Sequence, residues 1–103
     1  MCGICGIFNP SGIDDHDRSS IGNMTATLRH RGPDDLRTRV DDFTALGHTR
    51  LSIVDIEGGL QPMSNENGTI WTVFNGEIYN YRELRDYLSS RGHSFRTRCD
   101  TES

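Results

Sequence analysis

The sequence opens MCGICGIF, with a cysteine directly behind the initiator methionine and a second cysteine three residues later. Chain ends are usually frayed and expendable, so a thiol at residue 2 calls for a specific use. Small and apolar residues continue from Cys2 to Phe8 and end at the turn signal NPSG, which predicts a short buried strand. Because Cys2 and Cys5 have opposite parity, an ideal strand sends their side chains to opposite faces of its sheet.

The bulk properties exclude several classes of function. A chain of 103 residues forms at most one domain with a core of modest size. Its net charge is −4, and its cationic residues are scattered arginines with no lysine, which disfavours nucleic-acid binding and excludes Schiff-base or phosphate-loop chemistry. No apolar run could cross a bilayer and no signal peptide is recognisable, so no membrane partner is expected. Three cysteines without a secretion signal favour a reducing compartment, and we expect a cytoplasmic protein.

Two helices are predicted from the hydrophobic periodicity. The first lies within residues 14–32, is capped by Ser19 or Ser20 and stops at Gly32-Pro33. The second covers residues 80–92, where Asn80 and Glu83 have the spacing of a capping box and a glycine follows the last turn. The apolar faces comprise Ile21, Met24 and Leu28 in the first helix and Leu84, Tyr87 and Leu88 in the second.

Further strands are expected between and after the helices. Residues 43–56 predict one or two strands, 57–68 a loop, and 69–80 two strands joined at Asn75-Gly76, the strongest short hairpin signal. Residues 93–103 begin as another strand and end in Asp-Thr-Glu-Ser, which is typical of a turn into a further element.

Two kinds of chemistry are open to the terminal cysteines. A structural zinc site usually needs two closely spaced ligand pairs, and only one C-x-x-C pair occurs, so no metal ligand is assigned. A redox pair would open a helix, not lie within a strand. If Met1 is removed, residue 2 carries both a thiol and a free α-amine, and the amine can accept the thiol proton near neutral pH without a histidine. We therefore interpret Cys2 as a nucleophile and Cys5 as a small buried hydrophobe.

A thiol that attacks an acyl carbon also needs donors for the oxyanion. Asn75-Gly76 offers a side-chain amide beside an unshielded backbone N–H. The alternative is an ordinary hairpin turn, which the dipeptide alone favours. The histidines need no catalytic role and are interpreted as surface or structural residues: His16, His30, His48 and His93.

Five blocks in fixed order carry a family resemblance. They are MCGICGIF at the start, RHRGPD at 29–34, GHTRLSIVD at 47–55, NGEIYNY at 75–81 and CDTE at 99–102. Together they span nearly the whole chain, which therefore resembles the N-terminal glutaminase domain of class II glutamine amidotransferases, and within that class the asparagine synthetase type. The sugar-amidating and purine-pathway branches resemble it less.

The resemblance implies an α+β fold, the αββα sandwich of antiparallel sheets that N-terminal-nucleophile hydrolases share. Residues 1–103 would form the glutaminase domain, incomplete at the C-terminus, because the family's domain continues past Asp-Thr-Glu. The synthetase domain that normally follows, and that binds ATP and Mg, would be absent. No cofactor is therefore expected in this chain.

The resemblance also implies an activity, the hydrolysis of glutamine to glutamate and ammonia through a thioester on Cys2. The α-amine of Cys2 would act as general base, and Asn75 and Gly76 would hold the oxyanion. Arg50 would bind the glutamine carboxylate, a charge-assisted pair. The remaining contacts would come from the carboxylates of Glu77 and Asp100, which receive the ammonium, and from backbone groups of Leu51, Ile53 and Val54.

Glutamine is thus the expected substrate, and a synthetase domain or subunit that makes an amide, by default asparagine from aspartate, is the expected partner. Arg31 and Asp34 are interpreted as loop residues behind the site. Two alternatives remain, an inactive or regulatory fragment of the same fold that binds glutamine or a partner chain, and a small metal-binding module.

Overall fold

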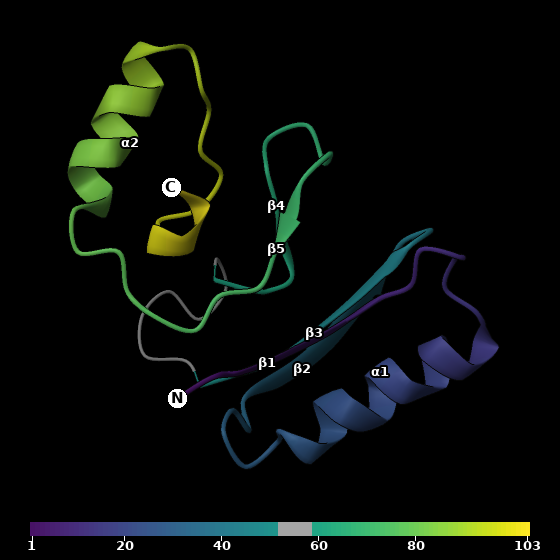
Figure 1. The fold of residues 1–103 in the computed structure, drawn as a ribbon. Helices are drawn as coiled ribbons and strands as arrows, with labels where there is room; N and C mark the ends of the chain where they lie inside the picture. Colours follow the sequence, from purple (N-terminus) through teal and green to yellow (C-terminus); the bar gives the residue numbers. More distant parts are fainter. Residues whose placement is uncertain (52–58) are drawn as a thin grey trace.

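The computed structural model describes residues 1–51 and 59–103, and these form an α+β fold with antiparallel sheets (Figure 1). The elements are, in chain order, β1 (Gly3–Phe8), α1 (Asp15–Thr27), β2 (Asp35–Val40), β3 (Thr44–Arg50), β4 (Met63–Ser64), β5 (Trp71–Thr72), α2 (Tyr81–Ser90) and the 3-10 helix η1 (Asp100–Glu102). Neither α-helix of the described ranges is long and apolar enough to cross a membrane.

The larger sheet has the strand order β1-β3-β2, with both pairs antiparallel. Strand β1 begins at Gly3, so the structure confirms a strand that starts almost at the chain end, but its predicted burial is wrong, because Gly3 is its only buried residue. It pairs with β3 from Gly3 opposite Thr49 to Phe8 opposite Thr44. Strand β2 was not predicted, because its sequence DLRTRV is polar and its residues remain exposed or half-buried at the sheet edge.

One face of this sheet packs against α1. Ile21 of the helix and Ala45 of β3 are buried there, and Cys5 Sγ lies 3.4 Å from Thr25 Oγ1. The helix can approach the sheet closely because the residue of β3 beneath it is Gly47. A Cβ at this position would fall 2.0 Å from the Thr25 hydroxyl. In Figure 1, α1 lies on one side of the sheet and the β4–β5 ribbon on the other.

The hairpin of this region lies at a different place from the predicted one. Strands β4 and β5 pair through a turn at Asn67-Gly68, where Gly68 has a φ of 73°. The second Asn-Gly, at 75–76, joins no strands, so the hairpin predicted there is wrong. A Cβ at Gly76 would meet the Phe74 ring at 2.7 Å, which explains the glycine by local space.

The helix starts differ from both predicted caps. Helix α1 is capped by Asp14, whose carboxylate accepts the Asp17 N–H while the Asp17 carboxylate accepts the Asp14 N–H, and not by Ser19 or Ser20. Hydrogen bonds from Asn9 and from the Asp14 backbone lower the pKa of Asp17, which fits a carboxylate at a helix start.

Helix α2 ends as predicted, with Gly92 at a φ of 95° just after it. The predicted capping box is wrong, because within the described structure the Asn80 side chain makes no capping hydrogen bond. None of the α2 residues, all of which are described, is buried.

The strand predicted after α2 does not form. The Glu102 carboxylate accepts hydrogen bonds from the backbone N–H groups of Arg96 and Thr97, at 2.6 and 2.7 Å. Those donors are thus satisfied by a side chain, and the segment loops back into η1. Arg85 of α2 supports the loop by donating to the carbonyls of Cys99 and Thr97.

Candidate functional site

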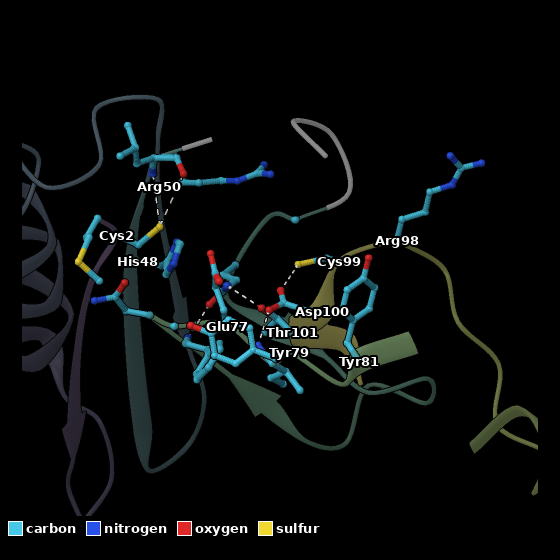
Figure 2. Close-up of a pocket in the computed structure, with 18 residues that line it drawn as sticks. Cys2, His48, Arg50, Glu77, Tyr79, Tyr81, Arg98, Cys99, Asp100 and Thr101 are labelled. Carbon is cyan, nitrogen blue, oxygen red and sulfur yellow. Dashed lines mark hydrogen bonds between the residues drawn. The ribbon is translucent and has the colours of Figure 1, made fainter. Parts of the chain in front are cut away.

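A cavity of about 630 Å³ opens where the end of β3, the segment after β5 and η1 meet (Figure 2). Of the residues that the sequence analysis assigned to a site, seven line it: Cys2, Arg50, Leu51, Asn75, Gly76, Glu77 and Asp100. The other two, Ile53 and Val54, lie outside the described residues.

The terminal cysteine is held in place by three neighbouring segments. The Leu51 N–H donates to Cys2 Sγ at 3.4 Å, and the sulfur lies 4.0 Å from the Leu51 carbonyl oxygen. Arg31 Nε donates to the Cys2 carbonyl at 3.2 Å, and the next residue, Gly3, donates its N–H to Thr49 Oγ1 at 3.1 Å. Residue 2 therefore has a defined position although it lies at the chain end.

Strand parity separates the two cysteines of the C-x-x-C pair. Cys5 faces α1, whereas Cys2 lines the cavity, as the sequence predicted. The pair cannot bind one metal ion from opposite faces of a strand. No group of three or more His, Cys, Asp or Glu side chains that could hold a metal occurs among residues 1–51 and 59–103.

Arg50 is the last residue of β3 and is only 5% exposed. It has the parity of His48 on that strand, so both side chains lie on the face opposite α1 and line the cavity. A buried guanidinium in a cavity wall is suited to bind a carboxylate in bidentate geometry.

Asp100 lies across the cavity, on the η1 side, with Glu77 from the segment after β5 (Figure 2). The Ile78 N–H donates to Asp100 Oδ2 at 2.8 Å, and Cys99 Sγ contacts Asp100 Oδ1 at 3.6 Å. The cavity thus has a cation in one wall and carboxylates in another, which suits a ligand with both charges.

The Asn75-Gly76 dipeptide follows Phe74, whose N–H donates to Gln61 Oε1 at 2.6 Å. Both residues of the dipeptide line the same cavity as the Cys2 thiol. The structure therefore brings the nucleophile candidate and the candidate oxyanion donors to one site.

His48 is a cavity residue that the sequence analysis missed, because it treated all histidines as surface or structural. It is 1% exposed, and its Nε2 has no hydrogen-bond partner among the described residues. Burial, with a smaller contribution from Arg50, lowers the pKa of His48, while the Phe74 backbone and Asp35 act in the opposite direction. The lowered pKa favours the neutral form of the imidazole. The signal in the sequence was the two-residue spacing from Arg50, which places both side chains on the same face of a strand.

Arg31 and Gln61 also support the site. Arg31 supports the site from behind, as interpreted from the sequence, through its contact with the Cys2 carbonyl, whereas Gln61 was part of a predicted loop. For Arg31 the motif RHRGPD was the signal, but its contact with residue 2 depends on tertiary packing.

Comparison with known proteins identifies the kind of domain. The family model described as glutamine amidotransferase domain matches residues 1–103. The chain is 45% identical over 104 residues to asparagine synthetase (glutamine-hydrolyzing) 1 of Bacillus subtilis (strain 168), a match that covers 99% of this chain and 16% of that protein.

Similar matches occur in eukaryotes. Identity is 43% over 102 residues to asparagine synthetase (glutamine-hydrolyzing) 3 of Arabidopsis thaliana and 42% over 103 residues to a probable asparagine synthetase (glutamine-hydrolyzing) of Dictyostelium discoideum. Each match covers 99% of this chain, and 17% and 18% of those relatives. The chain therefore spans less than a fifth of the length of the relatives it matches.

Proposed function

The chain belongs to the glutamine amidotransferase domain family, and on that premise we propose that it hydrolyses the side-chain amide of glutamine to glutamate and ammonia. The observation that carries the proposal is the cavity itself. Segments as distant as residues 1–2, 48–51, 74–79 and 98–101 meet there, with the Cys2 thiol, the buried Arg50 and the Asp100 carboxylate in its walls.

Removal of Met1 must precede catalysis. Met1 is 71% exposed, so an aminopeptidase can reach it, and it lines the cavity, so its loss frees the Cys2 α-amine at the site. The amine then takes the thiol proton, and the thiolate attacks the amide carbon of glutamine. The Leu51 N–H, which donates to the sulfur at 3.4 Å, holds the thiolate while it does so.

The tetrahedral oxyanion is stabilised by the Asn75 side-chain amide and the Gly76 N–H. When the intermediate collapses, the C–N bond breaks and the α-ammonium returns its proton to the departing ammonia. The resulting thioester is hydrolysed by water, which releases glutamate and restores the thiol. No metal is required for this sequence of steps.

The substrate's charged groups match the cavity walls. Arg50 holds the α-carboxylate, while Glu77 and Asp100 receive the α-ammonium, and backbone groups of Leu51, Ile53 and Val54 complete the pocket. Asp100 Oδ2 accepts the Ile78 N–H and Oδ1 contacts the Cys99 thiol, so neighbouring groups orient the carboxylate for the ammonium.

We infer that the domain family has the αββα sandwich of N-terminal-nucleophile hydrolases, in which residues 1–103 supply the glutamine-binding part. The ammonia passes to a synthetase domain or subunit that uses ATP and Mg to convert aspartate to asparagine. The names and greater length of the relatives support this partner. All three cysteines lie in the described residues and are free thiols, which fits a cytoplasmic location.

The test is the intact mass of the purified protein before and after exposure to a diazo-ketone analogue of glutamine. We expect Met1 to be absent and one adduct to form on Cys2, with glutamine slowing the labelling. The Cys5→Ala variant should be labelled like the wild type. Retained Met1, or processed protein without selective labelling, would leave an inactive or regulatory fragment as the better description.

A further inference from the structure

We propose that Gln61 is a positioning residue. It fixes the proposed oxyanion-binding segment, Asn75-Gly76, relative to the side of the pocket where Asp100 would bind the ammonium. The inference rests on the glutaminase function proposed above. Gln61 lies in the stretch between β3 and β4, which the sequence predicts only as loop, and no step of the mechanism uses it.

The side chain of Gln61 is placed to act on both segments. It is only 5% exposed and lines the cavity. Its Oε1 accepts the Phe74 N–H at 2.6 Å, and its Nε2 donates to Thr101 Oγ1 at 3.4 Å. One primary amide therefore connects the residue before Asn75 with the residue after Asp100.

The bond to Phe74 is the stronger of the two by its length. The Phe74 N–H belongs to the residue that directly precedes the proposed oxyanion donors. A buried N–H without a partner is costly, so loss of the Gln61 acceptor would move this backbone toward another partner. A shift of the backbone at Phe74 would turn the Asn75 amide and the Gly76 N–H away from the substrate oxygen.

The second connection comes from Asp100. Its carboxylate accepts the Ile78 N–H at 2.8 Å, so η1 and the segment after β5 are joined at two points, through Gln61 and through Asp100 (Figure 2). Removal of Gln61 leaves the Asp100 connection in place. We therefore expect a variant of Gln61 to retain glutamine binding and to lose the alignment that the chemistry needs.

The experiment compares Gln61→Met, which has similar size and no acceptor, with Gln61→Glu. The glutamate side chain keeps an oxygen for the Phe74 N–H in either protonation state, so it is the conservative rescue. Three quantities are measured on the full chain: the rate of thioester formation from glutamine by acid quench and intact mass, the Kd for glutamine, and the rate of Cys2 alkylation by iodoacetamide.

For Gln61→Met we expect thioester formation to fall by about tenfold, the effect of roughly one buried hydrogen bond. The Kd for glutamine and the iodoacetamide rate should change by less than about threefold, because binding and thiol reactivity do not use the oxyanion donors. Gln61→Glu should stay within about threefold of the wild type in all three.

The inference is overturned if Gln61→Met forms the thioester at the wild-type rate, if all three quantities fall together, or if Gln61→Glu is as impaired as Gln61→Met. In each of these cases the inference fails alone, because the wild-type protein is labelled by the diazo-ketone and forms the thioester. Wild-type protein that the diazo-ketone does not label at Cys2 would refute the glutaminase function itself.

Discussion

The thiol of Cys2 owes its position to contacts with residues far along the chain. The Leu51 backbone contacts its sulfur from both an N–H and a carbonyl, and the Arg31 guanidinium donates to its carbonyl. Chain ends without such contacts fray. The position of the Cys2 thiol therefore depends on Arg31, which follows α1, and on Leu51, which follows β3.

The two cysteines of the C-x-x-C pair allow a matched test of the proposed nucleophile. Cys2→Ala should abolish glutamine hydrolysis and diazo-ketone labelling while the Kd for glutamine stays within about threefold, because the sulfur is used in chemistry and not in binding. Cys5→Ala is the control, since Cys5 contacts only the α1 side through Thr25. Equal loss of activity in a folded Cys5→Ala protein would contradict the assignment of roles.

His48 predicts a pH dependence of stability. Burial lowers the pKa of His48 below its ordinary value of 6.5. Below pH 6.5 the unfolded chain therefore binds a proton that the folded chain excludes, so the free energy of unfolding falls as pH is lowered through this window. Urea unfolding should show this decline between about pH 7.5 and 5, a range that brackets the ordinary histidine pKa of about 6.5.

The control variants for this dependence are His48→Gln, which should flatten it, and His16→Gln at an exposed position, which should leave it unchanged. Three carboxylates with lowered pKa values, Asp17, Glu66 and Glu102, start from ordinary values of 3.8 to 4.5 and so affect stability only at lower pH. A wild-type slope in His48→Gln would show that another group is responsible.

At the level of the elements, β3 organises the site. Its central position gives it partners on both sides, and its alternation sends Gly47 and Thr49 toward α1 and His48 and Arg50 toward the cavity. Helix α1 covers the first face and so supports the strand from behind. The short β4–β5 ribbon lies over the second face, where the Arg39 guanidinium stacks 3.7 Å from the centre of the Trp71 ring.

The start of α1 gives a stability prediction. Asp14→Ala removes the N-cap acceptor and leaves the Asp17 N–H without it, so unfolding free energy should fall by about 1 kcal/mol. Ser19→Ala, inside the helix and exposed, should change it by less than about 0.5 kcal/mol. Both are measured by urea unfolding at pH 7. If Ser19→Ala were the more damaging variant, the cap would have been located wrongly.

For the whole molecule, the notable property is that both ends of the described chain reach the same cavity. Met1 lines it from the β1 side and Thr101 from the η1 side. Polar contacts hold the second end in place, among them the Glu66–His93 hydrogen bond at 2.7 Å and the donation from Arg96 to the Asn65 carbonyl. The pocket therefore exists only when the two halves of the chain are packed together.

This arrangement predicts that the N-terminus must be unblocked. A tag fused before Met1 should abolish glutamine hydrolysis, because it removes the free α-amine and adds a chain segment at the cavity. Cleavage of the tag so that Cys2 becomes the first residue should restore the rate, as measured by glutamate release. Full activity of the uncleaved fusion would refute the amine as general base.

Sequence reasoning succeeded where the physical cause is local. The alternation of a strand is enough to separate Cys2 from Cys5, and the left-handed backbone at Gly92 is enough to end α2. It failed where two local signals competed. Asp14 and Ser19 are both good caps, and Asn67-Gly68 and Asn75-Gly76 are both good turns, so only the pairing of β4 with β5 distinguishes the two dipeptides.

The sequence by itself determined the family, because five ordered motifs carry the resemblance to glutamine amidotransferase domains that the family model confirms over residues 1–103. Only the tertiary structure decided how they work together. The contact of Arg31 with residue 2 and the two hydrogen bonds of Gln61 join residues that are 13 to 40 positions apart. Such contacts arise from the packing of β3 against its neighbours, and no periodicity or local propensity encodes them.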